Sequence, residues 1–576
     1  MYRPTRPVWR AHAGAVAFFI ALACWQVGPV LGHLQTRALG HPGNDVWNHV
    51  WGYAFVADSL SQWQLPLHTE MLTWPGGGSL WFIDTFGALM TLPIQWVAGP
   101  VAAYNIGYLV NFALAGIGCY LLAWSVSRSH AGAMLAGIAF QTAPHLLGQA
   151  SNGISETLAI GWLPLALLAA RWAAARPSLR RGLVAGLMLG LCGLANWYYG
   201  LFAGMAVGGL LARGCFRLWR VRAVPNAEAW RALLGAAVIA GVVVIPPFLA
   251  FRHSMSVPDA IVTRDPSFVW STLVLHNMTD VVSLVRPGKH YSPDLKARFG
   301  EDLIVVVYLG HALLWPALGA IMGPLRAQAK SWAWLGLGFL VLTMGPFLFM
   351  DGQYVEILGG WLPLPFLGLH EAFPMFSRIS HAYRFVMGAT LALAILVAIL
   401  IRRLRLEGRP TLLLVLVLAT LRIGEAFYLS PAIFPIPYSE VRVPTIVSKL
   451  EDGAVLDLPV GVPILNRARY SINQLVHDQS IPYGLNDPVP PPVAANHFLR
   501  FLVEMEFSRA HTFPATLPWL DLELGRKMAV GDGLRWIVLH EALYTKGSFN
   551  RVSRFLDMVA TPVHHTEGLR IYRLDS

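Results

Sequence analysis

The chain alternates apolar runs with short polar connections over most of its length. A bilayer-crossing helix needs about 20 apolar residues, and runs close to that length recur between Ala13 and Leu429. They lie at 13–31, 104–126, 131–149, 157–175, 182–197, 198–212, 232–251, 303–322, 332–350, 383–401 and 411–429. This pattern predicts a polytopic α-helical membrane protein with about eleven transmembrane helices.

The basic residues indicate how these helices are oriented. When the eleven runs are counted as spans, the N-terminal arginines share one side with Arg128 and with loops 176–181, 213–222, 326–330 and 402–409. Cytoplasmic loops are rich in Lys and Arg, so this side is predicted to be cytoplasmic. Residues 84–103 form another apolar run. If this run crossed the membrane, every later basic loop would lie on the extracytoplasmic side. We therefore expect it to be re-entrant or interfacial, with Pro93 and Pro100 as helix breakers.

The long polar connections then share the opposite, extracytoplasmic face. They are 33–103, which is the first outer loop, 252–302, 351–382 and the segment after about 430. Residues 431–576 contain no spanning run and begin with several prolines, while apolar patterns at 454–460, 534–539 and 569–574 predict strands and 549–558 predicts a helix. The sequence thus predicts a transmembrane domain over 1–430 and an extracytoplasmic α/β domain over 431–576.

Composition supports a membrane protein and argues against other classes. Of the 576 residues, 55% are hydrophobic and 13% are charged, whereas soluble proteins have about 25% charged residues. The net charge of +11 arises in short loops, so it indicates topology and not a nucleic-acid partner. The first run is long enough to anchor the chain, which predicts a multi-pass membrane protein with a cytoplasmic N-terminus.

The first outer loop carries the strongest candidate chemistry. Residues 43–49 read Gly-Asn-Asp-Val-Trp-Asn-His, and Asn44 is expected to cap a helix that runs to about Gln64. On that helix Asp45 and His49 are four residues apart and share a face, while the indoles beside them would anchor the helix at the membrane interface. Two interpretations remain open: a catalytic carboxylate, or an amphipathic surface helix on which Asp45 only caps or is solvated.

Two further polar clusters fall on the predicted outer face. The segment 376–385 contains Arg378, His381 and Arg384, which suit a phosphate because guanidinium groups donate paired, charge-assisted hydrogen bonds. These arginines could instead extend toward lipid headgroups. The other cluster consists of His145, Gln149, Asn152, Ser155 and Glu156. Glu156 opens a predicted helix, so it could bind acceptor hydroxyls or simply cap the helix.

This layout resembles the GT-C superfamily of integral-membrane glycosyltransferases. A first span precedes a long outer loop with an acidic residue in a Gly-Asn-Asp-x-x-x-His context, and many spans and a C-terminal outer domain follow. Within the superfamily, the layout is similar to the YfhO-type and mannosyltransferase-like bacterial families. The resemblance implies an inverting transferase that moves a sugar from a polyprenyl-phosphate-linked donor to an extracytoplasmic glycan, lipid or protein acceptor.

In such an enzyme Asp45 is expected to be the catalytic base, because a hydroxyl acceptor attacks efficiently only when its proton is removed. The residues expected to bind substrate are Asn44, His49, Glu156, Arg378, His381 and Arg384. No Asp-x-Asp pair is present in the first outer loop, so no metal cofactor is predicted.

Two alternatives to a transferase remain. A lipid-glycan or solute transporter would need ionisable residues at mid-membrane depth, of which the spans contain few. The second alternative is a non-catalytic assembly protein with the same layout.

Overall fold

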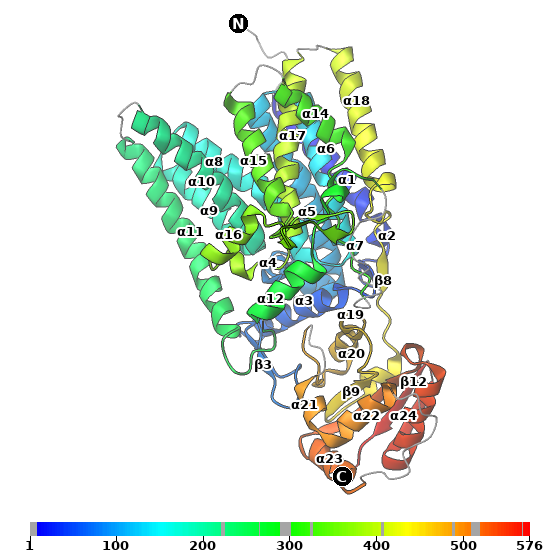
Figure 1. Ribbon diagram of the computed structural model, residues 1–576. Helices are drawn as coiled ribbons and strands as arrows, with labels where there is room; N and C mark the ends of the chain where they lie inside the picture. The colour runs from blue at the N-terminus through cyan, green and yellow to red at the C-terminus, as the bar shows by residue number, and fades with distance from the viewer. Residues whose placement is uncertain are drawn as a thin grey trace.

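The computed structural model describes residues 8–220, 225–263, 265–287, 301–322, 327–404, 408–485, 490–507, 519–566 and 568–575. A bundle of long helices occupies one end of the molecule and a smaller α/β domain the other (Figure 1). Parts of three predicted basic loops, 221–222, 326 and 405–407, lie outside the described residues.

Every predicted apolar run contains a helix. The bundle is built from α1 (Val8–Gln26), α5 (Leu92–Ser127), α6 (His130–Gln141), α7 (Pro144–Ser151), α8 (Trp162–Ala175), α9 (Leu179–Ala195), α10 (Trp197–Arg220), α11 (Ala227–Ser254), α14 (His311–Met322), α15 (Ala327–Thr343), α17 (Val386–Arg403) and α18 (Arg409–Gly424). Among the described residues five stretches are long and apolar enough to cross a membrane, namely Leu92–Ser127, Ser155–Ala175, Ala227–Ser254, Ala382–Arg403 and Arg409–Leu429. A mostly helical membrane architecture is confirmed, and the count of eleven spans remains a prediction.

The run 84–103 continues into the next helix. After the short α4 (Thr85–Met90), α5 begins at Leu92 and proceeds through the expected span 104–126 with a break at Gly99. Gly99 has φ +83°, a conformation that glycine adopts at no steric cost, and Pro100 has no backbone N–H to donate across the break. The run is therefore the kinked N-terminal part of α5.

Helices at the centre and at the periphery of the bundle differ sharply in burial. Within their most apolar stretches, 89% of the residues around α17 are buried but only 11% of those in α11. A helix that is apolar on all sides must face either other helices or lipid. α11 contacts α9 through glycines, since a Cβ at Gly182 would lie 2.1 Å from the Ala232 carbonyl oxygen. Small residues allow such close helix approach in membranes.

The C-terminal domain contains a four-stranded sheet in the order β11-β12-β10-β9. Its strands are β9 (Ala454–Leu458), β10 (Leu534–His540), β11 (Thr561–Thr566) and β12 (Leu569–Arg573), and its longer helices are α20 (Tyr470–His477), α22 (His497–Phe507), α23 (Trp519–Gly531) and α24 (Lys546–Val559). Strands β9 and β10 are parallel, and β12 pairs antiparallel with both β10 and β11. The three predicted strands and the predicted helix are confirmed. β11 was missed because Pro562 and adjacent histidines obscure its alternation.

The first outer loop holds this domain against the bundle. Strand β1 (Arg37–Leu39) pairs antiparallel with β8 (Tyr438–Glu440). The Trp51 indole N–H donates to Gln474 Oε1 on α20 at 2.7 Å, and the Trp74 indole N–H donates to the Asp532 carbonyl oxygen at 2.9 Å. The C-terminal domain therefore packs on residues that surround the candidate site.

Glu506 on α22 predicts how stability within this domain depends on pH. Burial raises the pKa of its carboxyl to about 7, even though Val460 N–H, Gly461 N–H and the Tyr544 hydroxyl donate to it. The unfolded carboxyl has the lower pKa, so it loses its proton first as pH rises. Stability conferred by Glu506 is therefore complete below about pH 4.5 and is lost as pH rises through about 7.

Replacing Glu506 with Gln should flatten this dependence of stability on pH, because the amide does not titrate. Thermal unfolding of the full-length protein at several pH values tests this expectation. Glu504→Gln, at an exposed position on the same helix, is the matched control. Equal pH slopes for Glu506→Gln and wild type would contradict the assignment.

Candidate functional site

The helix α3 (Val46–Ser61) begins at the central motif of the first outer loop. Asp45, not Asn44, occupies its N-cap position, and the Asp45 side chain makes no capping hydrogen bond. Asn44 is buried and donates through Nδ2 to the Asp302 carbonyl oxygen at 3.1 Å. The expectation that Asn44 caps the helix is therefore wrong, and so is the alternative in which the Asp45 side chain only caps it.

The setting of α3 also corrects its expected position on the membrane surface. Eleven of its 16 residues are buried, including Trp47 and Trp51 at 1% and 2% exposure. The Trp47 indole N–H donates to the Pro42 carbonyl oxygen at 2.8 Å. The indoles therefore pack inside the protein and do not anchor the helix at a lipid interface. The helix lies between the bundle and the C-terminal domain (Figure 1).

Asp45 is half-buried and held by its neighbours. Asn48 Nδ2 donates to Asp45 Oδ1 at 3.3 Å, and the Asp45 backbone N–H donates to the Asn152 carbonyl oxygen at 3.2 Å. Asn152 is itself fixed, because its Nδ2 donates to the Ile304 carbonyl oxygen at 2.7 Å. The Asp45 carboxylate thus has a defined position and remains partly exposed to solvent.

Three residues that were predicted to bind substrate lie close together near Asp45, namely His49, Glu156 and Arg384. His49 Nε2 lies 3.6 Å from Glu156 Oε2, and Arg384 Nη1 lies 3.6 Å from Glu156 Oε1. The exposure of His49, Glu156 and Arg384 is 4%, 2% and 5%. The Arg384 guanidinium also lies 5.0 Å from the centre of the Tyr198 ring, a cation–π distance. A role in helix capping does not explain why Glu156 lies beside Arg384. Contact with lipid headgroups does not explain why Arg384 is buried.

Asp84 belongs to the same group and was not identified from the sequence. Its Oδ2 accepts hydrogen bonds from the Ser155 hydroxyl and, at 3.0 Å, from the Tyr53 hydroxyl, while Oδ1 caps α4 by accepting from Gly87 N–H. Burial raises the pKa of Asp84 to about 6. An acidic residue just before a short apolar helix resembles an ordinary cap, so only its tertiary neighbours distinguish it.

His49 links Asp84 to Glu156. Its Nδ1 lies 2.9 Å from Ser155 Oγ, which also contacts Asp84. Burial, with the positive charge of Arg384 adding to it, lowers the pKa of His49 to about 3. His49 is therefore a neutral imidazole at physiological pH.

The other two predicted residues have different surroundings. The His381 backbone N–H donates to the Tyr198 hydroxyl at 3.2 Å, which places His381 at the edge of the group that contains Arg384. Arg378 is exposed, in contrast to the buried Arg384. Among the described residues, no three His, Cys, Asp or Glu side chains are grouped so that they could hold a metal ion.

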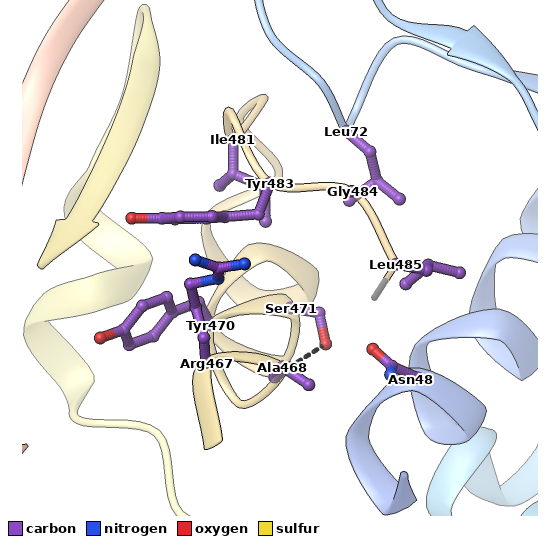
Figure 2. Close-up of a pocket in the computed structure, with 10 residues that line it drawn as sticks. All are labelled: Asn48, Leu72, Arg467, Ala468, Tyr470, Ser471, Ile481, Tyr483, Gly484 and Leu485. Atoms are coloured by element: carbon purple, nitrogen blue, oxygen red, sulfur yellow. Dashed lines mark hydrogen bonds between the residues drawn. The ribbon is translucent and has the colours of Figure 1, made fainter. Parts of the chain in front are cut away.

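A narrow cavity separates α3 from the C-terminal domain (Figure 2). Asn48, which donates to Asp45, lines one side, and Arg467, Tyr470 and Tyr483 line the other. Figure 2 shows the Arg467 guanidinium beneath the Tyr483 ring, 5.1 Å from its centre. The cavity volume is about 10 Å³, close to what a single water requires. The C-terminal domain thus closes over the side of α3 that carries Asn48.

Comparisons with solved structures define the fold. Arabinofuranosyltransferase AftD from Mycobacteria matches with a TM-score of 0.55 at 13% identity, over 98% of this chain and 40% of AftD. A mutant of AftD matches with a TM-score of 0.57 at 13% identity, over 98% of this chain and 42% of that one. The chain has the fold of GT-C membrane glycosyltransferases. This confirms the GT-C-like layout expected from the sequence, although the chain spans less than half the length of AftD.

A third GT-C structure, ArnT from Cupriavidus metallidurans bound to undecaprenyl phosphate, matches with a TM-score of 0.43 at 11% identity, over 97% of this chain and 98% of ArnT. No protein-family profile and no curated protein matches the sequence. At these identities the comparisons establish the GT-C fold and leave the site residues to be judged from their own geometry.

Proposed function

We propose that this protein is a membrane glycosyltransferase that moves a sugar from a polyprenyl-phosphate-linked donor to an extracytoplasmic acceptor. One observation carries the proposal: a half-buried carboxylate, Asp45, stands at the start of α3 beside the buried group formed by His49, Glu156 and Arg384. In this proposal Asp45 removes the acceptor's proton as the hydroxyl attacks the anomeric carbon, which inverts its configuration. A glycan, lipid or protein hydroxyl could be the acceptor.

The cationic side of the site suits the leaving group. Transfer leaves a polyprenyl phosphate, on which negative charge develops, and a buried guanidinium stabilises such charge strongly because little water competes. Arg384 is assigned this role, and His381 and Asn44 are assigned to substrate contacts at the edge of the site. The exposed Arg378 is assigned to the first electrostatic contact with the phosphate.

The orientation of the protein follows the same proposal. Because the basic loops predict a cytoplasmic N-terminus, Asp45 and the C-terminal domain would face the extracytoplasmic side of a bacterial inner membrane. The packing of α20 on α3 fits an arrangement in which the C-terminal domain covers the acceptor side of the site. The boundary between the two domains is placed at residue 430.

A glycolipid assay separates a transferase from a transporter. The purified protein in lipid nanodiscs is supplied with a mixture of polyprenyl-phosphate-linked sugars and acceptors extracted from a deletion strain, and mass spectrometry follows both. A transferase depletes one donor and adds its sugar mass to an acceptor. Movement of donor across proteoliposomes without consumption would instead support a transporter, and neither consumption nor movement would favour the non-catalytic alternative.

A further inference from the structure

Four buried side chains form a chain of contacts from Asp84 to Glu156. Ser155 Oγ contacts Asp84 Oδ2 and lies 2.9 Å from His49 Nδ1, and His49 Nε2 lies 3.6 Å from Glu156 Oε2. The exposure of Asp84, Ser155, His49 and Glu156 is 2%, 1%, 4% and 2%. Two carboxyl groups are thus connected through a hydroxyl and an imidazole, away from bulk water.

The chemistry of these groups allows two arrangements with equal numbers of protons. A serine hydroxyl has one hydrogen, and a neutral imidazole has one N–H. If Ser155 donates to an ionised Asp84, it accepts from His49 Nδ1–H, and the lone pair on Nε2 then faces a protonated Glu156. If Asp84 is protonated and donates to Ser155, then Ser155 donates to Nδ1, and His49 Nε2–H faces an ionised Glu156.

We propose that Asp84, Ser155, His49 and Glu156 form a proton wire that moves one proton between the two carboxyl groups. In one direction the Glu156 O–H bond breaks as N–H forms at His49 Nε2. The Nδ1 proton passes to Ser155 Oγ, and the Ser155 proton passes to Asp84 Oδ2. Glu156 becomes a carboxylate, Asp84 becomes a neutral acid, and His49 remains neutral with its tautomer exchanged, so atoms and net charge balance.

One step of the wire must close before a proton can pass. The 3.6 Å between His49 and Glu156 exceeds a hydrogen bond, which needs roughly 2.7–3.2 Å. Glu156 Oε2 is buried and has no hydrogen-bond partner among the described residues. A small rotation of the Glu156 side chain toward His49 therefore breaks no hydrogen bond at that oxygen.

The position of the proton sets the charge beside Arg384. When the proton is on Asp84, ionised Glu156 balances the guanidinium 3.6 Å away. When the proton is on Glu156, no ionised carboxylate among the described residues forms an ion pair with Arg384, which can then pair with an incoming anion. Other titratable groups also interact electrostatically with Glu156 or Arg384, namely Asp45, Tyr108, His145, Tyr198, Tyr199 and Tyr383.

The wire thereby lets a buried arginine exchange its internal counter-ion for a phosphate diester without taking a proton from water. This consequence rests on the proposed function, because the anion is assigned as the phosphate of the sugar donor. The wire itself depends only on the four side chains and on Arg384.

Isotope-edited infrared spectroscopy of the full-length protein in nanodiscs tests the wire without a ligand. With ¹³C-carboxyl glutamate incorporated, the carboxylic acid C=O band shifts only if the protonated group is a glutamate. All spectra are taken in a Glu506→Gln background, because Glu506, with its pKa raised to about 7, would otherwise add a glutamic acid band of its own. At about pH 6, where burial keeps Asp84 partly protonated, we expect an unshifted aspartic acid band in this parent protein, identified by its loss in Asp84→Asn. In Arg384→Gln we expect a shifted glutamic acid band, because no positive charge then stabilises ionised Glu156. Arg384→Lys should retain the wild-type band.

Ser155 provides a control that keeps both carboxyl groups. Ser155→Ala removes the hydroxyl that connects Asp84 to His49. Because the equilibrium position of a proton does not depend on its path, the rate is measured: after a temperature jump, time-resolved infrared spectra should show slower exchange between the aspartic and glutamic acid bands in Ser155→Ala than in the parent protein. Ser155→Thr should restore the parent rate. A monodisperse elution profile for each variant checks its fold. Identical band positions in wild type and Arg384→Gln, or an exchange rate that is insensitive to Ser155→Ala, would overturn the wire.

Asp45→Asn separates the wire from the proposed function. This variant should keep the wild-type aspartic acid band, because removing the negative charge of Asp45 near Glu156 favours the ionised Glu156 that is already expected there. Bands that behave as expected in a protein without transferase activity would reject the function and retain the wire. Transferase activity that requires Asp45, in a protein whose bands do not move with Arg384, would reject the wire alone.

Discussion

Replacing Asp45 with Asn is expected to lower the rate of sugar transfer by about 10²–10⁴-fold, the usual contribution of a positioned general base. Asn48 and the backbone around Asp45 hold an amide at this position much as they hold the carboxylate. The loss should therefore appear in kcat with little change in the KM for the donor, because the variant lacks the proton acceptor but retains the phosphate-binding side of the site. Single-turnover transfer by the purified protein measures it.

Asp58→Asn is the matched control for this experiment. Asp58 lies on the same helix, is exposed, and accepts a hydrogen bond from Gln62 at 3.0 Å on the protein surface. It should retain wild-type transfer and wild-type stability. Asp45→Glu should keep part of the activity because it retains a base at a displaced position. Full activity in Asp45→Asn would remove Asp45 from the mechanism.

Replacing Glu425 with Ala is expected to destabilise the bundle by about 3–5 kcal/mol, the range found when a buried charge network loses one member. Glu425 Oε1 accepts from the Tyr308 hydroxyl and from His311 N–H, both at 2.6 Å, and Oε2 accepts from Ala312 N–H at 3.0 Å. Two of these donors are the first backbone N–H groups of α14, which have no partner within their own helix. Buried donors without an acceptor are costly.

Glu425→Ala would also remove a negative charge that balances Arg422. Arg422 is 1% exposed and donates to the carbonyl oxygens of Leu309 and Ala139, and the nearby Glu425 carboxylate compensates its positive charge. Thermal unfolding in detergent and the yield of monodisperse protein measure the loss. Glu371→Ala, at an exposed position, should have no effect. An unchanged melting temperature for Glu425→Ala would show that water replaces the carboxylate in this part of the bundle.

The contrast between Glu425 and Glu156 illustrates what sequence patterns could and could not predict. Both are acidic residues in or next to apolar helices, and the local sequence around them does not show which partners they have. Glu425 satisfies three donors, whereas Glu156 Oε2 has no hydrogen-bond partner among the described residues and faces His49 and Arg384. Only the positions of residues distant in the sequence distinguish these cases.

The sequence by itself determined the membrane class, the helical runs, the strands β9, β10 and β12, and the GT-C-like layout. The membrane class, the helices and the strands follow from local periodicity and from the cost of burying polar backbone in lipid, which act within single segments, whereas the GT-C-like layout was expected from a family resemblance. The tertiary structure decided that α3 is enclosed by protein, that Asp45 stands at its N-cap position, and that Asp84, Ser155, His49, Glu156 and Arg384 form one buried group. Their grouping depends on packing between residues as far apart in the sequence as His49 and Arg384, and no local pattern encodes such long-range contacts.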